Sequence, residues 1–346
     1  PKMLFSSNGP LALKWNYVPK MIPWFLHYLK NCNTKSMLHT AKYMHQILNL
    51  SMDAYEEIFK EVDMTGLVEK KGIIYIWTNQ NLKSRNLEIK VRNDLGIKQK
   101  LLSQKEILDL EPNLNPVFDA GVIYDDSMHA KDPHGILKKI FELYLNKGGK
   151  FIKENVSSLK QISNNETYVQ TDTKKYKFEK TVIASGAFSK KLTDQLGENI
   201  PLDTERGYHV HFKNMESLIS RPVIFLDRGF GLTPMNQGLR AVGTVELGGL
   251  KNPPSIKRIK YVINCAKELL PQLKEHQDEW LGFRPTLPDF LPILGPSLKN
   301  KNIVYAFGHH HLGWTLGAIT GKIVSGIVAE EKTNLDLSPY SSTRFN

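Results

Sequence analysis

A glycine-rich segment, Gly308–Gly321, carries the clearest pattern for chemistry. An apolar strand pattern precedes it, and a helical pattern begins inside it, near Trp314. The start of a helix offers unpaired N–H groups and a partial positive charge, which suit an anion or an electron-rich ring edge. Gly313, Gly317 and Gly321 recur every four residues and leave one helix face bare for close packing against a sheet or a cofactor. Tight helix packing without a ligand explains the same pattern.

Three consecutive histidines, His309 to His311, lie inside this segment. Adjacent residues do not easily turn toward one metal ion, and no metal-ligand spacing such as HxxxH surrounds them. No metal site is therefore predicted. The histidines are interpreted as satisfied loop residues or as side chains that line a ligand cavity.

Arg284 stands between Phe283 and Pro285 at the end of an expected strand. A guanidinium held rigidly in apolar surroundings suits the bidentate recognition of a carboxylate. Tyr208, in the alternating stretch 205–211, is a second candidate for contact with a polar substrate. A structural ion pair for Arg284 and cross-strand packing for Tyr208 are the alternatives.

The stretch 182–189 predicts a buried strand that ends in the small residues Ala184, Ser185 and Gly186, with a helix after them. In open α/β sheets ligands bind at the carboxyl ends of the strands, where small residues let the backbone approach closely. An ordinary strand-to-helix turn would have the same residues. None of these patterns decides a function by itself.

The composition is that of a globular protein. Of 346 residues, 41% are hydrophobic and 23% charged, which excludes an intrinsically disordered chain. Two cysteines, Cys32 and Cys265, exclude a disulfide scaffold or a multi-cysteine metal cluster. No apolar run approaches the roughly 20 residues of a membrane span. The net charge of +11 indicates a solvated basic surface or an attraction to anionic lipid. No stripe of basic and aromatic residues points to nucleic acid.

Periodicity predicts the elements that must position these residues. Apolar residues at helical spacing favour helices in 15–63, 82–95, 103–110, 132–146, 256–270 and about 314–331. Strands are expected at 71–77, 121–125, 151–156, 180–184 and 302–307, and period-2 stretches predict antiparallel sheet over 202–246. This order predicts an α/β core interrupted by an α+β insertion.

Taken together, the segments resemble the FAD-dependent D-amino-acid oxidase superfamily. The stretches 182–189, 201–210, 238–246, 282–297 and 308–321 occur in the family's order. Within it the chain is most similar to the bacterial D-amino-acid dehydrogenase small subunit, which the stretch 10–29 also resembles. The resemblance implies a Rossmann-like, glutathione-reductase-like FAD-binding domain in 127–200 and 284–346. It also implies an antiparallel-sheet substrate-binding domain in 1–126 and 201–283.

One element of the family is missing from this sequence. The family opens with a strand–GxGxxG–helix–strand unit that holds the cofactor's pyrophosphate, and no GxGxxG is present here. The chain, which starts at Pro1, is therefore interpreted as an N-terminally truncated member. A non-catalytic remnant is the alternative.

The resemblance also implies roles for individual residues. Arg284 and Tyr208 are the expected catalytic residues and, with His309, the expected substrate contacts. Leu287 stands where eukaryotic oxidases of the family have a second arginine, which favours the dehydrogenase subgroup. The expected FAD contacts are Val156, Ala184, Ser185, Gly186, Gly308, Gly313, Trp314, Thr315 and Leu316.

The implied activity is the oxidative deamination of D-amino acids to 2-oxo acids and ammonia. Hydride passes from the α-carbon to FAD, and the electrons pass to a quinone of the respiratory chain. A sister enzyme acting on glycine, sarcosine or a cyclic imino acid is the alternative. The expected location is the bacterial cytoplasm, with peripheral attachment to the inner face of the inner membrane. No nucleic-acid partner is expected.

Overall fold

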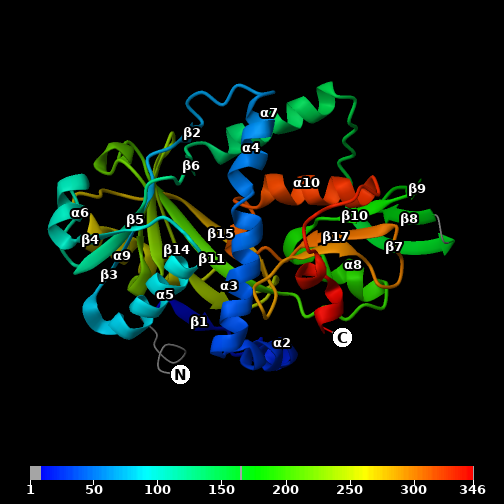
Figure 1. The fold of residues 1–346 in the computed structure, drawn as a ribbon, viewed down its shortest axis with the longest axis horizontal. Helices are drawn as coiled ribbons and strands as arrows, with labels where there is room; N and C mark the ends of the chain where they lie inside the picture. The colour runs from blue at the N-terminus through cyan, green and yellow to red at the C-terminus, as the bar shows by residue number, and fades with distance from the viewer. Residues whose placement is uncertain (1–8, 164–165, 346) are drawn as a thin grey trace. The chain divides into compact units, whose positions relative to one another are not determined.

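The computed structural model describes residues 9–163 and 166–345 (Figure 1). The chain divides into two compact units, each built from three segments. The first unit comprises Pro1–Asn16, Val62–Leu143 and Arg206–Gly282. The second comprises Tyr17–Glu61, Tyr144–Glu205 and Phe283–Asn346.

A large, mostly antiparallel sheet forms the first unit. Its strand order is β15-β11-β14-β13-β12-β3-β5-β4, and β1 pairs with β14. The antiparallel sheet predicted for 202–246 is confirmed, for example by the pairing of β13 with β14. The strands are β1 (Leu11–Leu13), β3 (Ile73–Trp77), β4 (Lys100–Ser103), β5 (Ala120–Tyr124), β11 (Asp203–Phe212), β12 (Val223–Phe225), β13 (Phe230–Met235), β14 (Gly238–Leu247) and β15 (Gln277–Thr286).

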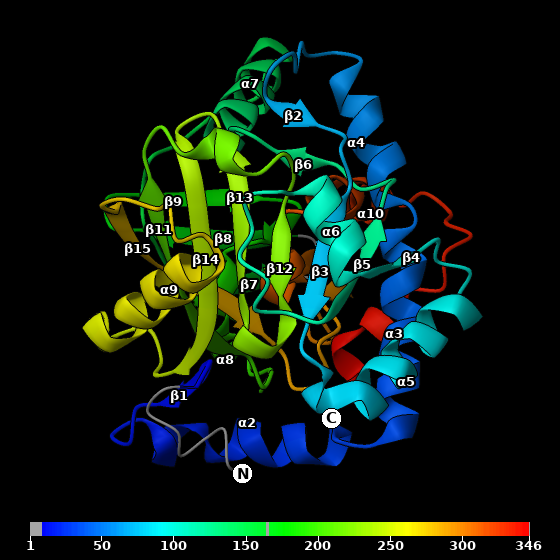
Figure 2. The ribbon, with the colours of Figure 1, turned by 90° about the vertical axis from the view of Figure 1, so that its left-hand side faces the viewer.

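One face of this sheet is covered by α9 (Ile256–Leu269) (Figure 2). Tyr208 and Val210 of β11 enter the same buried cluster as Ile259 and Val262 of α9. Side chains alternate along a strand, so His209 and His211 lie on the opposite face, where their rings contact each other. The remaining elements of this part of the chain are β2 (Val68–Glu69), α5 (Leu82–Asp94), α6 (Gln104–Leu110), β6 (His129–Ala130) and α7 (Pro133–Asn146).

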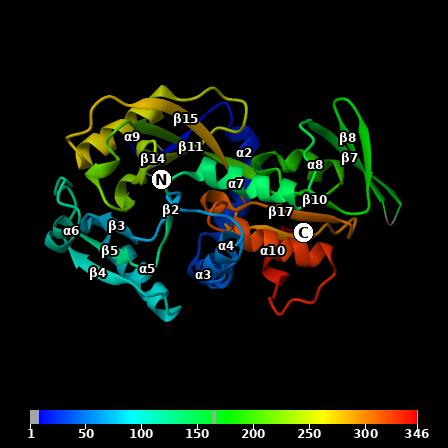
Figure 3. The ribbon, with the colours of Figure 1, turned by 90° about the horizontal axis from the view of Figure 1, so that it is seen from above.

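The second unit contains a small sheet of order β10-β17-β16. Strands β10 (Thr181–Ile183) and β17 (Ile303–Phe307) are parallel, and β16 (Ile293–Pro296) runs antiparallel to β17. Helix α10 (Gly317–Val328) packs on β16, β17 and α4 (Ser51–Phe59) (Figures 1 and 3). The other elements are α2 (Val18–Asn31), α3 (Thr34–Leu48), β7 (Val156–Ser163), β8 (Glu166–Thr171), β9 (Lys175–Phe178) and α8 (Lys190–Gln195).

Two local expectations are corrected. The strand expected at 151–156 is wrong: residues 151–155 are irregular, and β7 begins at Val156 and pairs with β8. An apolar run becomes a strand only where a partner strand satisfies its backbone, and Phe151 and Ile152 are exposed instead. Helix α10 begins at Gly317, later than expected, because residues 310–312 form a short 3₁₀ turn.

The unit boundaries also differ from the predicted division. Residues 17–61 were expected in the substrate domain, but they belong to the second unit, and residues 127–143 belong to the first. Ile47 and Ala54 share a buried cluster with Leu316 and Ile319 of the α10 region. An amphipathic pattern shows which face of a helix is buried but not which element buries it.

Candidate active site

Arg284 lies in the last part of β15, within the second unit. Burial lowers the pKa of the Arg284 guanidinium, while the nearby negative charge of Glu205 raises it. A guanidinium stays protonated in proteins, so a partly buried positive charge is fixed here. Such a charge suits a carboxylate ligand.

Glu205 and His311 lie near this charge, and His310 contacts both of them. His310 Nε2 lies 2.6 Å from Glu205 Oε2, and the rings of His310 and His311 share a hydrogen bond. His310 has φ of +52°, a left-handed conformation that few non-glycine residues adopt. Burial, the neighbouring His310 and the charge of Arg284 lower the pKa of His311 to about 4. His311 is therefore neutral at pH 7, which leaves an imidazole near Arg284 that can accept a hydrogen bond.

Aromatic side chains form the apolar wall of this cluster. Phe290 meets the His310 ring edge-on at 5.0 Å and the Tyr28 ring at 5.9 Å between centroids. Tyr28 stacks on Trp24 of α2, whose Nε1 donates to the carbonyl of Thr286 at 3.1 Å. The inner face of α2 is thereby fixed against the turn that follows Arg284.

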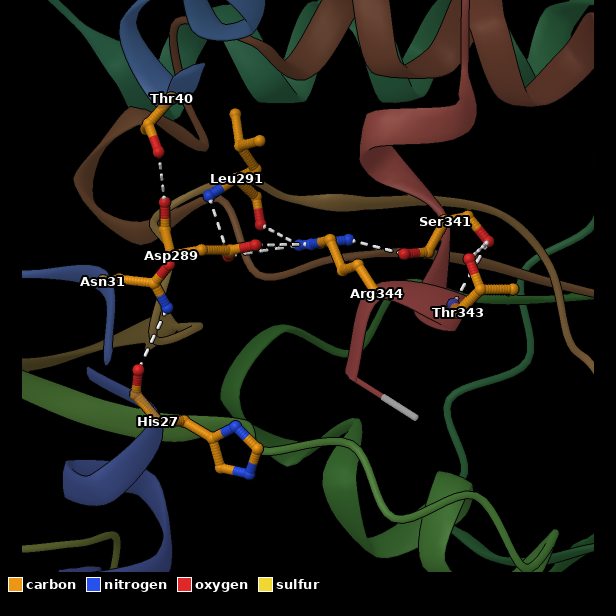
Figure 4. Close-up of polar contacts among 8 residues, drawn as sticks. All are labelled: His27, Asn31, Thr40, Asp289, Leu291, Ser341, Thr343 and Arg344. Carbon is orange, nitrogen blue, oxygen red and sulfur yellow. Dashed lines mark hydrogen bonds and ion pairs between the residues drawn. The ribbon is translucent and has the colours of Figure 1, made fainter. Parts of the chain in front are cut away.

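The turn itself is held by the C-terminal segment (Figure 4). Arg344 forms a two-point pair with Asp289, Nε to Oδ2 at 2.5 Å and Nη2 to Oδ1 at 3.3 Å. Arg344 Nη2 also donates to the carbonyl of Leu291 at 2.6 Å, and Thr40 Oγ1 donates to the carbonyl of Asp289 at 3.0 Å. Phe290 has φ of +62°, so these bonds hold a turn that its backbone does not favour.

The turn that precedes α10 presents backbone donors without a partner in the part of the chain that the structure describes. The backbone ladder begins with Leu316 N to Leu312 O at 2.8 Å and Gly317 N to Trp314 O at 3.2 Å. Within residues 9–163 and 166–345, no backbone acceptor is found for the amides of Gly313 and Thr315. These amides and the helix dipole suit a carbonyl-rich ring edge or an anion. Of the predicted FAD contacts here, Leu316 is buried in the core, which leaves only its backbone for a ligand.

Two further predicted cofactor segments lie in the same unit. After β10, Ala184 and Ser185 are exposed, and a Cβ at Gly186 would meet open space. After β17, Gly308 has φ of +88°, and a Cβ there would lie 2.3 Å from the Leu287 side chain. Small residues therefore follow both parallel strands, as a ligand that approaches the backbone requires. Val156 opens β7 instead of closing the strand that was expected before it.

His309 is placed differently from its two neighbours. Its side chain is buried, and Nε2 lies 2.9 Å from Thr320 Oγ1 of α10. Burial lowers the pKa of His309 to about 4. This histidine ties the loop to the helix, whereas Glu205 and His311, which were not among the expected substrate contacts, lie near Arg284.

Tyr208 belongs to the first unit and is 1% exposed. Its hydroxyl donates to Glu246 Oε2 at 2.6 Å and accepts from Ser255 N at 3.0 Å. Arg206 Nε lies 3.2 Å from the same carboxylate oxygen. Burial, with the Glu246 hydrogen bond, raises the pKa of Tyr208 to about 12. The hydroxyl is thus engaged within a buried polar network.

The opposite face of β11 carries a cluster that the sequence analysis left unassigned. His209 stacks on Trp280 at 4.8 Å between centroids, and Arg240 Nε donates to His211 Nε2 at 3.1 Å. Burial, Arg240 and His211 lower the pKa of His209 to about 3. This face therefore carries neutral imidazole beside a guanidinium.

A family comparison decides what these features belong to. The model of the DAO family, FAD dependent oxidoreductase, matches residues 19–327. The chain belongs to this family. A D-amino-acid oxidase of Bradyrhizobium diazoefficiens is 31% identical over all of this chain and 83% of its own length. A D-amino acid dehydrogenase of Helicobacter pylori is 28% identical over 99% of this chain and 83% of its own length. Glycine oxidase from Geobacillus kaustophilus shares the fold, with a TM-score of 0.74, 22% identity and coverage of 86% and 81% of the two chains.

The resemblance stated from the sequence and the mixed α/β fold are thereby confirmed. The cofactor of this DAO-family chain is FAD. The residues fit it: the turn before α10 has amides without a backbone acceptor among the described residues, and small, accessible residues follow β10. No helix among the described residues is long and apolar enough to cross a membrane. In the same part of the chain, no group of three or more His, Cys, Asp and Glu residues is arranged to hold a metal ion.

Proposed function

We propose that this DAO-family oxidoreductase carries out the oxidative deamination of D-amino acids to 2-oxo acids and ammonia. One observation carries the proposal. The partly buried guanidinium of Arg284 and the amides of Gly313 and Thr315, which have no backbone acceptor among the described residues, lie in the same compact unit. The first suits a substrate carboxylate and the second suits a flavin edge. The names of the two curated relatives support D-amino acids as the substrate class.

In this proposal Arg284 binds the substrate carboxylate and fixes the α-carbon, because positioning supplies much of the rate in such reactions. Glu205 and the neutral His311 offer acceptors for the protons of the substrate amine. Phe290, held by the Asp289–Arg344 pair, excludes water from one side of Arg284. His309 is a positioning residue that keeps the loop on α10. Tyr208 does not contact the substrate in this proposal; it positions β11 through its buried hydrogen bond to Glu246, which also pairs with Arg206.

When bound, FAD supplies the acceptor for the hydride that leaves the α-carbon. The amides of Gly313, Trp314 and Thr315 would hold the pyrimidine edge of the ring, and the start of α10 would stabilise negative charge there. Ala184, Ser185, Gly186 and Gly308 would line the cofactor with little side-chain bulk, and Val156 would contact its adenine side through the backbone.

Electron delivery to a respiratory-chain quinone at the inner face of the cytoplasmic membrane is part of the proposal. The name of the Helicobacter pylori relative, a dehydrogenase, supports an electron acceptor other than oxygen. Leu287 favours the dehydrogenase subgroup, because eukaryotic oxidases of the family have a second arginine at this position.

The test uses the full chain mixed with FAD and freed of unbound flavin. We expect bands of bound flavin that bleach with D-alanine in the absence of oxygen and persist with L-alanine. Bleaching by glycine, sarcosine or proline but not by D-alanine would overturn the substrate class. Bound flavin that no amino acid reduces would overturn the activity.

A second measurement separates the acceptors. Reduced protein is mixed either with oxygenated buffer or with a short-chain quinone, and flavin reoxidation is followed by stopped flow. We expect the quinone to reoxidise the flavin at least about tenfold faster at equal concentration. Faster reoxidation by oxygen would overturn the quinone assignment and leave the deamination intact.

A further inference from the structure

The first 52 residues carry an unusual charge distribution. They contain six lysines and neither aspartate nor glutamate, so they hold more than half of the net charge of +11. Helices α2 (Val18–Asn31) and α3 (Thr34–Leu48) lie in this stretch. An acid-free helix pair attracts anionic partners and offers no carboxylate to cationic ones.

The two faces of α2 differ in what covers them. Met21 and Trp24 are buried, and the Trp24 indole donates to the carbonyl of Thr286. Ile22, Leu26 and Leu29 are 51%, 56% and 50% exposed. Their spacing of four and three residues places them on one side of a helix. The helix thus has an apolar stripe that faces outward beside the stripe that anchors it.

Lysines accompany this outer stripe. Lys20 and Lys30 are exposed near the two ends of α2, and Lys35 is exposed in the first turn of α3. Met37 and Leu38 add exposed apolar surface in α3. Leucine and isoleucine on one side, exposed lysines near the helix ends and no acidic residue are the features of a helix that lies in the headgroup region of a bilayer. Lysine stems can extend along apolar surface while the ammonium groups reach phosphates.

We propose that α2 is an interfacial helix that docks this protein onto a membrane surface containing anionic lipid. Ile22, Leu26 and Leu29 enter the headgroup region, and Lys20, Lys30 and Lys35 contact lipid phosphates. The inner face of the same helix packs on the turn after Arg284, so docking places the candidate active site next to the bilayer. The docking does not rest on the proposed function; only its consequence for a membrane-dissolved electron acceptor does.

Vesicle co-sedimentation of the full chain, without substrate, tests the docking. We expect binding to phosphatidylcholine vesicles that contain phosphatidylglycerol, weak binding to pure phosphatidylcholine, and weakening by salt. The triple variant I22S/L26S/L29S loses about tenfold or more in affinity, because three half-exposed apolar side chains no longer enter the bilayer. L82S/L101S/L137S changes similarly exposed leucines elsewhere and stays within about twofold of wild type.

Charge is tested with a matched pair of variants. K20Q/K30Q/K35Q lowers the affinity for anionic vesicles by about tenfold or more. K105Q/K257Q/K260Q removes the same charge from other exposed positions and has a smaller effect. Equal losses in the two variants would show that only the net charge acts, and they would overturn α2 as the docking element.

Two controls keep the proposal falsifiable. An environment-sensitive dye on L26C, in a C32S background, shifts to the blue with anionic vesicles, whereas a dye on L137C does not. The absence of that shift overturns the proposal even if the triple variants fold poorly. A wild-type dimer in size-exclusion chromatography that I22S/L26S/L29S converts to monomer, without vesicle binding by wild type, would assign the stripe to a second copy instead. Deamination, assayed without vesicles, stays independent of these outcomes.

Discussion

At the scale of single residues, the candidate site depends on one positive charge with a defined set of neighbours. Arg284 is the only member of the set that sequence reasoning singled out as a carboxylate ligand. Glu205, His310 and Phe290 complete it through contacts of 2.6 Å and 5.0 Å. These partners lie in three separate stretches of the chain. Each stretch was recognised in the sequence, but no single stretch shows that its residues meet those of the other two.

Arg284→Lys tests the central charge. Lysine keeps the charge but loses the planar fork that binds a carboxylate at two points. We expect kcat/KM for D-alanine to fall by about 100-fold, chiefly through KM, which corresponds to about 2.7 kcal/mol. Arg228→Lys, at a surface pair with Glu268, is the control and should change kcat/KM by less than about twofold. Equal kinetics for Arg284→Lys and wild type would remove Arg284 from the site.

The three histidines show where residue-level prediction stops. The sequence shows that three histidines follow one another, and the prediction assigned the substrate contact to His309. In the structure His309 is bonded to Thr320, and His310 adopts a left-handed backbone that turns the chain toward Glu205. A backbone conformation that the residue type disfavours leaves no signal in a single sequence.

At the scale of elements, two glycines of α10 differ in whether the surrounding structure has room for a side chain. A Cβ at Gly317 would lie 3.1 Å from the Tyr55 hydroxyl, whereas a Cβ at Gly321 would meet nothing within 4 Å. Tyr55 donates to the carbonyl of Trp314, so displacement of its hydroxyl would disturb the start of the helix. The glycines that recur every four residues therefore have different reasons: Gly317 avoids a clash with Tyr55, whereas the space around Gly321 would admit a side chain.

Gly321→Ala and Gly317→Ala form a matched pair. Alanine inside a helix is favoured over glycine by about 0.5–1 kcal/mol, so Gly321→Ala should raise Tm by about 2 °C. Gly317→Ala should show no gain or a loss of about 1 kcal/mol, because the added methyl group crowds Tyr55. Thermal unfolding of both variants, with and without FAD, measures this. An equal gain in both would mean that Tyr55 does not restrict this position.

The turn after Arg284 depends on the C-terminal segment. Asp289→Asn breaks the paired bonds to Arg344, which are mostly buried, and should destabilise the protein by about 1–2 kcal/mol. It should also raise KM, because Phe290 loses its fixed place. Asp194→Asn, at an exposed helical pair with Lys190, should cost less than about 0.5 kcal/mol. Urea unfolding and D-alanine kinetics measure the two effects, and a loss as small as that of Asp194→Asn would contradict the prediction.

At the scale of the whole molecule, the sequence predicted the architecture better than its division. The alternation in 205–211 matches β11, where Tyr208 and Val210 face the core cluster and His209 and His211 lie on the other face. The helix expected over 103–110 is present as α6, and a capping box between Ser103 and Glu106 fixes its start. Local chemistry determines such features. Residues 17–61 belong to the second unit because elements far away in the sequence bury their apolar faces. Neither periodicity nor composition predicts which elements these are.

Buried neutral histidines in both units should make stability depend on pH. His309 has a folded pKa of about 4, below the unfolded value of roughly 6.5. Between these values the unfolded chain binds more protons than the native chain, so stability falls as pH falls through this window. Above pH about 7 His309 contributes no pH dependence, because it is neutral in both states. His209 and His311, with folded pKa values of about 3 and about 4, act in the same direction.

From these values His309 alone should lower stability by about 2 kcal/mol between pH 7 and pH 5. His309→Gln keeps a partner for Thr320 but cannot be protonated, so it should flatten the pH dependence by that amount. His39→Gln, at an exposed position, should leave the slope unchanged. Urea unfolding at pH 7, 6 and 5 measures all three proteins. Parallel pH profiles for wild type and His309→Gln would show that folding does not lower the pKa of His309, and they would contradict the prediction.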